Sequence, residues 1–83
     1  MVTDALITLN DFTPIIDDLP ELHHDPMGPS LSVPVLVRRS FGGYSVAMLT
    51  QWDDEPPRWI HDGPDAYDIT DSVISWTYLP PGP

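Results

Sequence analysis

Two alternating runs of residues on either side of Gly42 and Gly43 restrict this chain to a β-rich fold. Residues 31–39 (LSVPVLVRR) and 44–52 (YSVAMLTQW) alternate in character and are rich in valine or aromatic residues. Two such runs joined by a Gly-Gly turn predict an antiparallel hairpin. Pro34 cannot donate a hydrogen bond to a neighbouring strand. We therefore expect it at a strand start, at a bulge, or with its nitrogen facing solvent.

Three other segments have the character of strands. Residues 58–60 (RWI) are long enough for a short third strand, and residues 72–79 alternate again as a last strand. The apolar segment 2–9 could add a first strand. Residues 12–29 contain three prolines, one glycine and then a fourth proline, which are too many breaks for a long helix, so we expect an ordered loop. Residues 65–71 could form a single helical or 3-10 turn.

Together these patterns predict one domain over residues 1–83. We expect a mainly β fold, with α+β as an alternative. Its core is a small sheet of three to four antiparallel strands with long, irregular, acidic connections and at most one or two short helical turns. With 41% hydrophobic residues the chain has enough apolar material for a small core. A domain of this size buries only about 60–65% of its unfolded surface, so a partner or a homodimer would add useful burial.

Composition also excludes several kinds of protein. No apolar run approaches the roughly 20 residues of a membrane span, and the start of the sequence has no basic region, so we expect a cytoplasmic protein. Cysteine is absent, which removes disulfides, thiol catalysis, iron–sulfur clusters and the common zinc ligand sets.

Charge is the strongest functional signal. Thirteen Asp and Glu residues stand against three Arg and no Lys, giving a formal net charge of −10 and a pI near 4.1. Direct binding to nucleic acid or an anionic membrane depends on cationic side chains and is therefore excluded. An acidic protein of this kind is steered instead towards a basic partner surface. The simpler alternative is that the acidity only maintains solubility.

The acidic residues fall into two blocks, residues 4–25 and 53–71, and the second contains our candidate partner-binding residues. The first group, residues 53–55, is an acidic turn followed by two prolines that limit its flexibility. The second group, residues 62, 65, 68 and 71, recurs at every third position. On a 3-10 turn the second group would align at about 6 Å, near the spacing of phosphates. Alternatively its first and last members cap a short helix and the middle two face water. The candidates are Asp53, Asp54, Glu55, Asp62, Asp65, Asp68 and Asp71.

The tryptophans are the other candidates for a contact surface. Core packing is the expected role of at least two of the three. One that is exposed would instead anchor a partner, because Trp and Arg are enriched at binding hot spots. We consider Trp59, which follows Arg58, and Trp52 at the end of the hairpin.

Metal binding and catalysis have little support in the sequence. His23, His24 and Asp25 offer ligand atoms, with Glu21, His61 and Asp62 as additional ones, but their spacing matches no metal motif. No nucleophile motif brings a Ser, a His and an Asp together. We therefore expect no metal, no cofactor and no enzymatic activity.

Short motifs along the chain resemble a phage and prophage family known as domain of unknown function 551. They comprise an LPE segment at 19–21, the VLV strand at 35–37, Val46-Ala47, Trp59 and a closing V-x-x-W-x-x-LP at 73–80. The match covers about residues 10–83. It lacks the tryptophan that the family tends to carry near its start, and Ser75 stands where the family often has His. The resemblance implies a phage or mobile-element origin and a small β-rich fold, and it implies no activity.

In size and charge the chain is also similar to the small acidic inhibitors of phages, such as anti-CRISPR proteins and DNA mimics. A nucleic-acid channel lined with Lys and Arg can be occupied by a rigid array of carboxylates. We therefore expect a non-catalytic inhibitor that binds a basic surface of a host nucleic-acid-binding complex, with a CRISPR effector as the suspected target. The alternative is an accessory structural or oligomeric interaction protein whose acidity serves only solubility.

Overall fold

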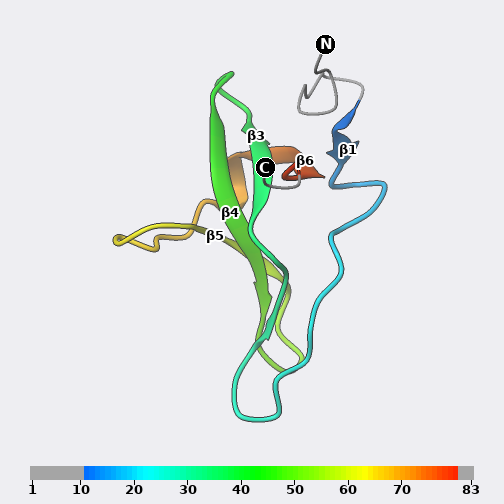
Figure 1. Cartoon of the computed structure of the whole chain (residues 1–83), viewed down its shortest axis with the longest axis vertical. Coiled ribbons are helices and arrows are strands. Elements are labelled where there is room, and N and C mark those ends of the chain that lie inside the picture. The colour runs from blue at the N-terminus through cyan, green and yellow to red at the C-terminus, as the bar shows by residue number, and fades with distance from the viewer. Residues whose placement is uncertain (1–10, 81–83) are drawn as a thin grey trace.

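The structure is a computed structural model that describes residues 11–80, and in this range it is an antiparallel β-sheet (Figure 1). A 3-10 turn, η2 (Thr70–Ser72), precedes the last strand. The mainly β prediction is confirmed, and the strand predicted at residues 2–9 lies outside the described residues. The six strands are β1 (Thr13–Pro14), β2 (Ser30–Leu31), β3 (Val35–Arg39), β4 (Tyr44–Gln51), β5 (Arg58–His61) and β6 (Val73–Tyr78).

The predicted hairpin is formed by β3 and β4, and β6 pairs with the other side of β3. The strand order is β1-β6-β3-β4-β2, with β5 also paired to β4. Pro34 lies directly before β3, as its missing N–H requires. Residues 32–34 separate β2 from β3, and within this segment Ser32 continues the hydrogen bonding to β4. Its backbone N–H donates to the Leu49 carbonyl at 2.9 Å, and its hydroxyl oxygen accepts from the Leu49 N–H at 2.8 Å.

One face of the sheet carries the hydrophobic core. Side chains of successive residues alternate between the two faces, so every second residue of β3 and β4 points inward. Ile15 and Leu22, from the long segment between β1 and β2, pack against this core. The buried cluster comprises Val35, Val37, Ala47, Leu49, Trp59, Ile69, Val73 and Trp76.

The segment between β1 and β2 is an ordered loop that is fastened to the sheet at both ends. The indole Nε1 of Trp76 donates to the Asp18 carbonyl at 2.9 Å, and the Glu21 N–H donates to the Tyr78 hydroxyl at 3.3 Å. Further along, His23 and Leu31 exchange two backbone hydrogen bonds. The loop therefore runs along the side of the molecule instead of crossing free solvent (Figure 1).

The single helical or 3-10 turn predicted within residues 65–71 is present only at the end of that range, as the 3-10 turn η2 (Thr70–Ser72), and residues 65–69 are not helical. The Ala66 N–H closes a turn on the Gly63 carbonyl at 3.2 Å, after which the chain becomes extended along the outer edge of β5. There the His61 N–H donates to the Tyr67 carbonyl and the Ile69 N–H donates to the Trp59 carbonyl, both at 2.8 Å. Because these groups bond to β5, they are not available for the local bonds of a helix. Among the described residues no helix has the length and apolar character needed to cross a membrane.

Candidate acidic partner-binding surfaces

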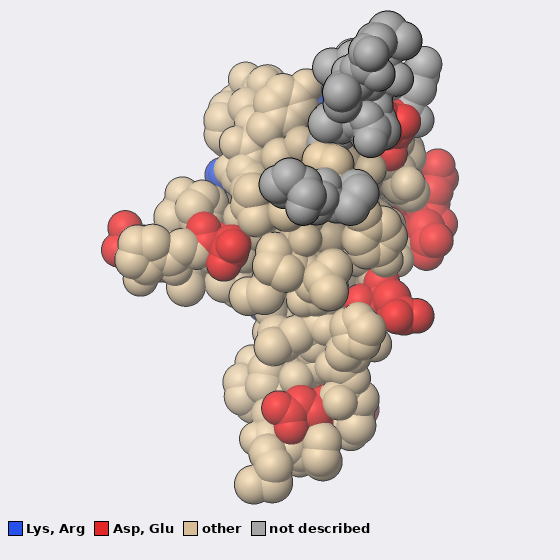
Figure 2. Space-filling view, in the orientation of Figure 1, with Lys and Arg blue, Asp and Glu red and all other residues tan. Residues whose placement is uncertain are grey.

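Acidic side chains cover the surface with few cations to balance them. All twelve Asp and Glu residues that the structure describes are exposed. On the face drawn in Figure 2, acidic side chains lie at opposite margins of the molecule and on its lower arm, and little Arg is visible. Arg58 pairs with Asp68, whereas Arg39 is half-buried and donates to the hydroxyls of Ser72 at 2.7 Å and Ser45 at 2.8 Å. The arginines therefore leave most of the surface carboxylates unneutralised.

The first group of candidate acidic residues, residues 53–55, forms the turn that follows the C-terminal end of β4. The Glu55 N–H donates to the Trp52 carbonyl at 2.8 Å, and the Gln51 side chain donates to the Glu55 carbonyl at 3.0 Å. Asp53 has a φ of 43°, a left-handed conformation that Asp tolerates better than most residues. The side chains of Asp53, Asp54 and Glu55 are exposed and make no hydrogen bond or ion pair within the described part of the chain.

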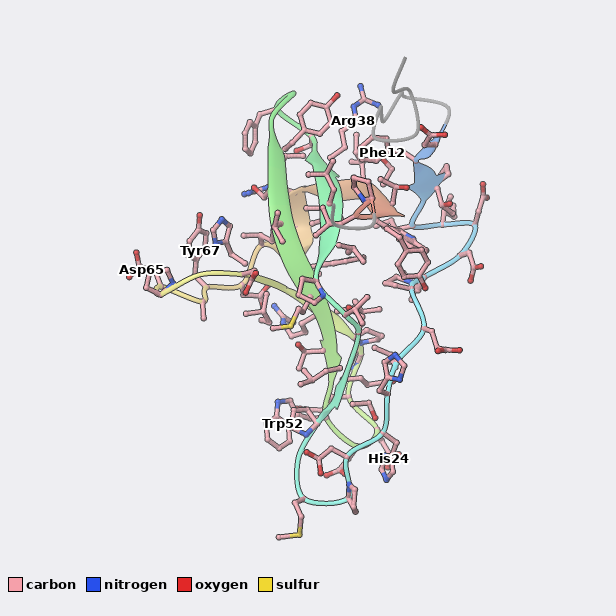
Figure 3. All side chains as sticks on the ribbon, in the orientation of Figure 1. Phe12, His24, Arg38, Trp52, Asp65 and Tyr67 are labelled. Carbon is pink, nitrogen blue, oxygen red and sulfur yellow. The ribbon has the colours of Figure 1, made fainter. Side chains whose placement is uncertain are left out.

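Trp52 stands at this turn with 54% of its surface exposed (Figure 3). The same end of the molecule includes the turn before β2, because Ser30 pairs with Gln51. That turn carries Met27, which is 92% exposed. The backbone N–H of Met27 donates to the Asp25 carboxylate at 2.9 Å. The β2–β4 pairing thus brings a second acidic turn with an exposed apolar side chain to the acidic turn at Asp53. Sequence patterns do not reveal this neighbourhood, because the two turns are about 25 residues apart in the chain.

The second predicted group does not form a regular array. Asp62 and Asp65 lie on the loop that projects beyond β5, with Asp65 near its tip (Figure 3). Asp68 lies instead beside β5, where it forms an isolated bridge with Ile60, and Asp71 belongs to η2. The four carboxylates are therefore distributed over a loop, a strand edge and a 3-10 turn. The 6 Å alignment that the spacing predicted is wrong.

Asp68 in particular makes hydrogen bonds and an ion pair with other residues of the protein. Its carboxylate accepts from the Thr70 hydroxyl at 2.6 Å and from the Thr70 N–H at 2.8 Å, and it pairs with the Arg58 guanidinium. The Thr70 bonds, helped by Arg58, lower the pKa of Asp68 from 3.8 to about 2. Conversely, Asp68 raises the pKa of Arg58. Asp68 therefore holds the segment after β5 in place and is a poor candidate for partner contact.

Trp59 is not an exposed anchor. Its side chain is in the core with 2% of its surface exposed, and its backbone N–H donates to the Thr70 hydroxyl at 2.8 Å. Trp76 is also buried, so core packing accounts for two of the three tryptophans, as predicted. Trp52 is the tryptophan that is available to a partner.

The histidines make local contacts. His23 lies 3.7 Å from the Glu21 carboxylate, His24 is 3.4 Å from the Ser30 hydroxyl, and the His61 ring stacks on Tyr67 with centroids 4.8 Å apart. Within residues 11–80, no three side chains of His, Asp or Glu come together in a geometry that could hold a metal ion.

No protein-family model matches this chain, and no match is found among curated proteins or among solved structures. The resemblance to the phage family of domain 551 therefore stays a prediction, and the function must be argued from the surface.

Proposed function

We propose that this protein is a non-catalytic inhibitor of phage or mobile-element origin that acts in the bacterial cytoplasm. It binds a basic, nucleic-acid-binding surface of a host complex, with a CRISPR effector as the suspected target, through its acidic turn at residues 52–55 and its projecting loop at residues 62–65. The observation that carries the proposal is the exposure of every described acidic residue, with a single one, Asp68, paired with an arginine.

The state of these carboxylates favours binding to cations. A carboxylate with an internal partner would lose that partner on binding, whereas Asp53, Asp54, Glu55, Asp62 and Asp65 have no such hydrogen bond or ion pair among the described residues. Each can form charge-assisted hydrogen bonds with Lys or Arg of a target. A net charge of −10 also accelerates the encounter with a basic surface.

The acidic turn carries an apolar component as well. Trp52 is exposed and directly precedes the three acidic residues in the chain, and Pro56 and Pro57 follow them. Binding hot spots combine an aromatic anchor with surrounding polar contacts that exclude water. Because prolines limit the freedom of the unbound turn, less conformational entropy is lost on binding. Trp52 therefore takes the anchoring role that the sequence analysis considered for Trp59.

An accessory oligomeric protein is the alternative, and one feature of the sheet favours it. The face opposite the core carries Leu36, Val46, Met48 and Ile60, which are only partly buried. A second copy could cover this face, in which case the acidity would serve solubility alone.

A binding titration against guide-loaded CRISPR effector complexes and other nucleic-acid enzymes separates the two candidates. The inhibitor proposal expects saturable binding that competes with DNA or RNA and weakens with salt. Self-association that depends on protein concentration in sedimentation, together with no binding to any basic target, would support the alternative.

Charge-reversed variants localise the contact. Asp62→Lys/Asp65→Lys should weaken binding strongly, as should the triple reversal of Asp53, Asp54 and Glu55. The matched control, Asp17→Lys/Glu21→Lys, changes the net charge as much as the first variant but lies on the loop beside β6. Equal effects of the control and the first variant would show that net charge alone matters.

A further inference from the structure

A pocket of about 270 Å³ opens on the sheet beside β1, away from both acidic surfaces. It is formed where β1, β6 and β3 lie next to one another. Figure 3 shows Arg38 and Phe12 at this end of the sheet. The lining residues are Phe12, Pro14, Arg38, Ile74 and Ser75.

A β-bulge in β6 shapes the pocket. Arg38 pairs with Ser75 but Arg39 pairs with Val73, so Ile74 is an extra residue without a partner on β3. A bulge of this kind redirects a side chain out of the regular alternation. Ile74 consequently lines the pocket next to Ser75, although regular alternation would put these neighbours on opposite faces.

Two polar groups in the pocket have no partner among the described residues. The hydroxyl of Ser75 is buried, since the residue is only 7% exposed, and it makes no hydrogen bond there. Within the described ranges no carboxylate lies at ion-pair distance from the Arg38 guanidinium, although the chain is strongly acidic. Buried polar groups in proteins are normally hydrogen-bonded, so an unpaired hydroxyl on a residue that lines a pocket points to a ligand there.

Apolar surfaces surround these two groups. The Phe12 ring lies 5.7 Å from the Tyr44 ring, and Tyr44 pairs with Arg38 across the β3–β4 hairpin. Pro14 pairs with Ser75 on the opposite side. The pocket thus combines one cation and one hydroxyl donor with walls of aromatic, proline and isoleucine side chains.

The geometry points to a binding site for a single carboxylate group carried on an apolar or aromatic body. A guanidinium binds a carboxylate through two parallel hydrogen bonds, and the Ser75 hydroxyl can donate a third. One guanidinium neutralises one negative charge. A phosphate dianion would keep an uncompensated charge in the field of a protein of net charge −10, so a monoanion is favoured. This site is independent of the proposed acidic contact.

Phenylacetate is a suitable probe because it combines one carboxylate with one ring. The pocket is slightly smaller than those that hold drug-sized ligands, so we expect a Kd of about 1 mM. Titration of the full chain, followed by amide chemical shifts in NMR, should give saturable shifts at residues 74–76. Phenylacetamide has the same shape without the charge and should not bind, and inorganic phosphate should bind more weakly than phenylacetate.

Variants at the pocket test the assigned roles. Arg38→Gln should weaken phenylacetate binding about tenfold or more, Arg38→Lys should restore part of it, and Ser75→Ala should weaken it severalfold. Arg58→Gln is the control, because it removes the same charge far from the pocket and should leave the affinity unchanged. NMR spectra of the free variants show directly whether each is folded.

The source of the carboxylate follows from a second titration. A short peptide that ends in a free Phe carboxylate should bind more tightly than phenylacetate if the natural ligand is a polypeptide terminus, and its amidated form should not bind. Equal affinity for the free-acid peptide and for phenylacetate would identify the natural ligand as a small organic acid. Tighter binding of the peptide and equal binding of the two probes both support a carboxylate site. The proposal is overturned if phenylacetate gives no saturable shifts, or if Arg38→Gln binds it as well as the unaltered chain does.

Discussion

Arg58 and Asp68 form an ion pair across the loop that follows β5, and the same carboxylate binds the backbone and hydroxyl of Thr70. Thr70 in turn accepts a hydrogen bond from the Trp59 N–H. The network therefore connects β5 to the segment that leads into η2 and β6. It also explains why Asp68, although exposed like the other described acidic residues, is a poor candidate for partner contact.

We expect Asp68→Ala to lower the free energy of unfolding by about 0.5–1.5 kcal/mol, because the N–H and hydroxyl of Thr70 lose their acceptor, while the exposed Arg58 guanidinium is hydrated by water instead. Asp65→Ala, on the exposed loop, is the control and should change stability by no more than about 0.5 kcal/mol. Urea unfolding at neutral pH measures both. Equal stability of the two variants would contradict the structural role of Asp68.

The same carboxylate predicts a pH dependence. Folding lowers the pKa of Asp68 from 3.8 to about 2, so its ionised form is favoured in the folded state. Its contribution to stability is complete above pH 4 and is lost as the pH falls towards 2. Asp68→Asn should therefore reduce the slope of the thermal midpoint against pH in this window. An unchanged slope would show that other groups dominate the acid sensitivity.

The two aromatic candidates should respond in opposite ways to truncation. Trp59→Ala removes a buried side chain and should cost about 3–5 kcal/mol of stability, whereas Trp52→Ala should have little effect. In binding experiments the order reverses, since Trp52→Ala should weaken the proposed contact by about 2 kcal/mol. Unfolding curves and target titrations of the two variants provide the comparison, and unaffected binding of Trp52→Ala would remove the anchoring role.

Two buried serines offer a matched test of hydrogen bonding. Ser32 is 4% exposed and its hydroxyl oxygen accepts the Leu49 N–H, while Ser75 is 7% exposed without a partner among the described residues. Ser32→Ala should destabilise the protein by about 1–3 kcal/mol because a backbone N–H loses its acceptor. Ser75→Ala should be neutral or slightly stabilising in the absence of ligand. A destabilised Ser75→Ala, measured by thermal unfolding, would indicate that this hydroxyl already has a structural partner.

Local patterns predicted the hairpin because alternation, valine content and the Gly-Gly turn are all properties of neighbouring residues. The strand β1 was missed since Thr13 and Pro14 have no strand pattern of their own and are extended through pairing with Trp76 and Ser75. The spacing of the acidic residues suggested a 3-10 array, but edge pairing with β5 overrode the local preference at Asp68. The pocket at Arg38 depends on a bulge, which a sequence pattern does not reveal.

Salt dependence tests the proposed function most directly. Screening shortens the Debye length from about 10 Å at 0.1 M salt to about 3 Å at 1 M, so association of a protein of net charge −10 with a basic channel should slow sharply as salt rises. Nucleic acid bound in that channel should also block the contact. A contact made through Trp52 alone would depend weakly on salt and would fail on truncation of that side chain. Stopped-flow association at two salt concentrations, with and without competing nucleic acid, distinguishes these cases. Salt-insensitive binding that proceeds equally well on nucleic-acid-loaded target would exclude occupation of the channel and reassign the acidic turns to solubility.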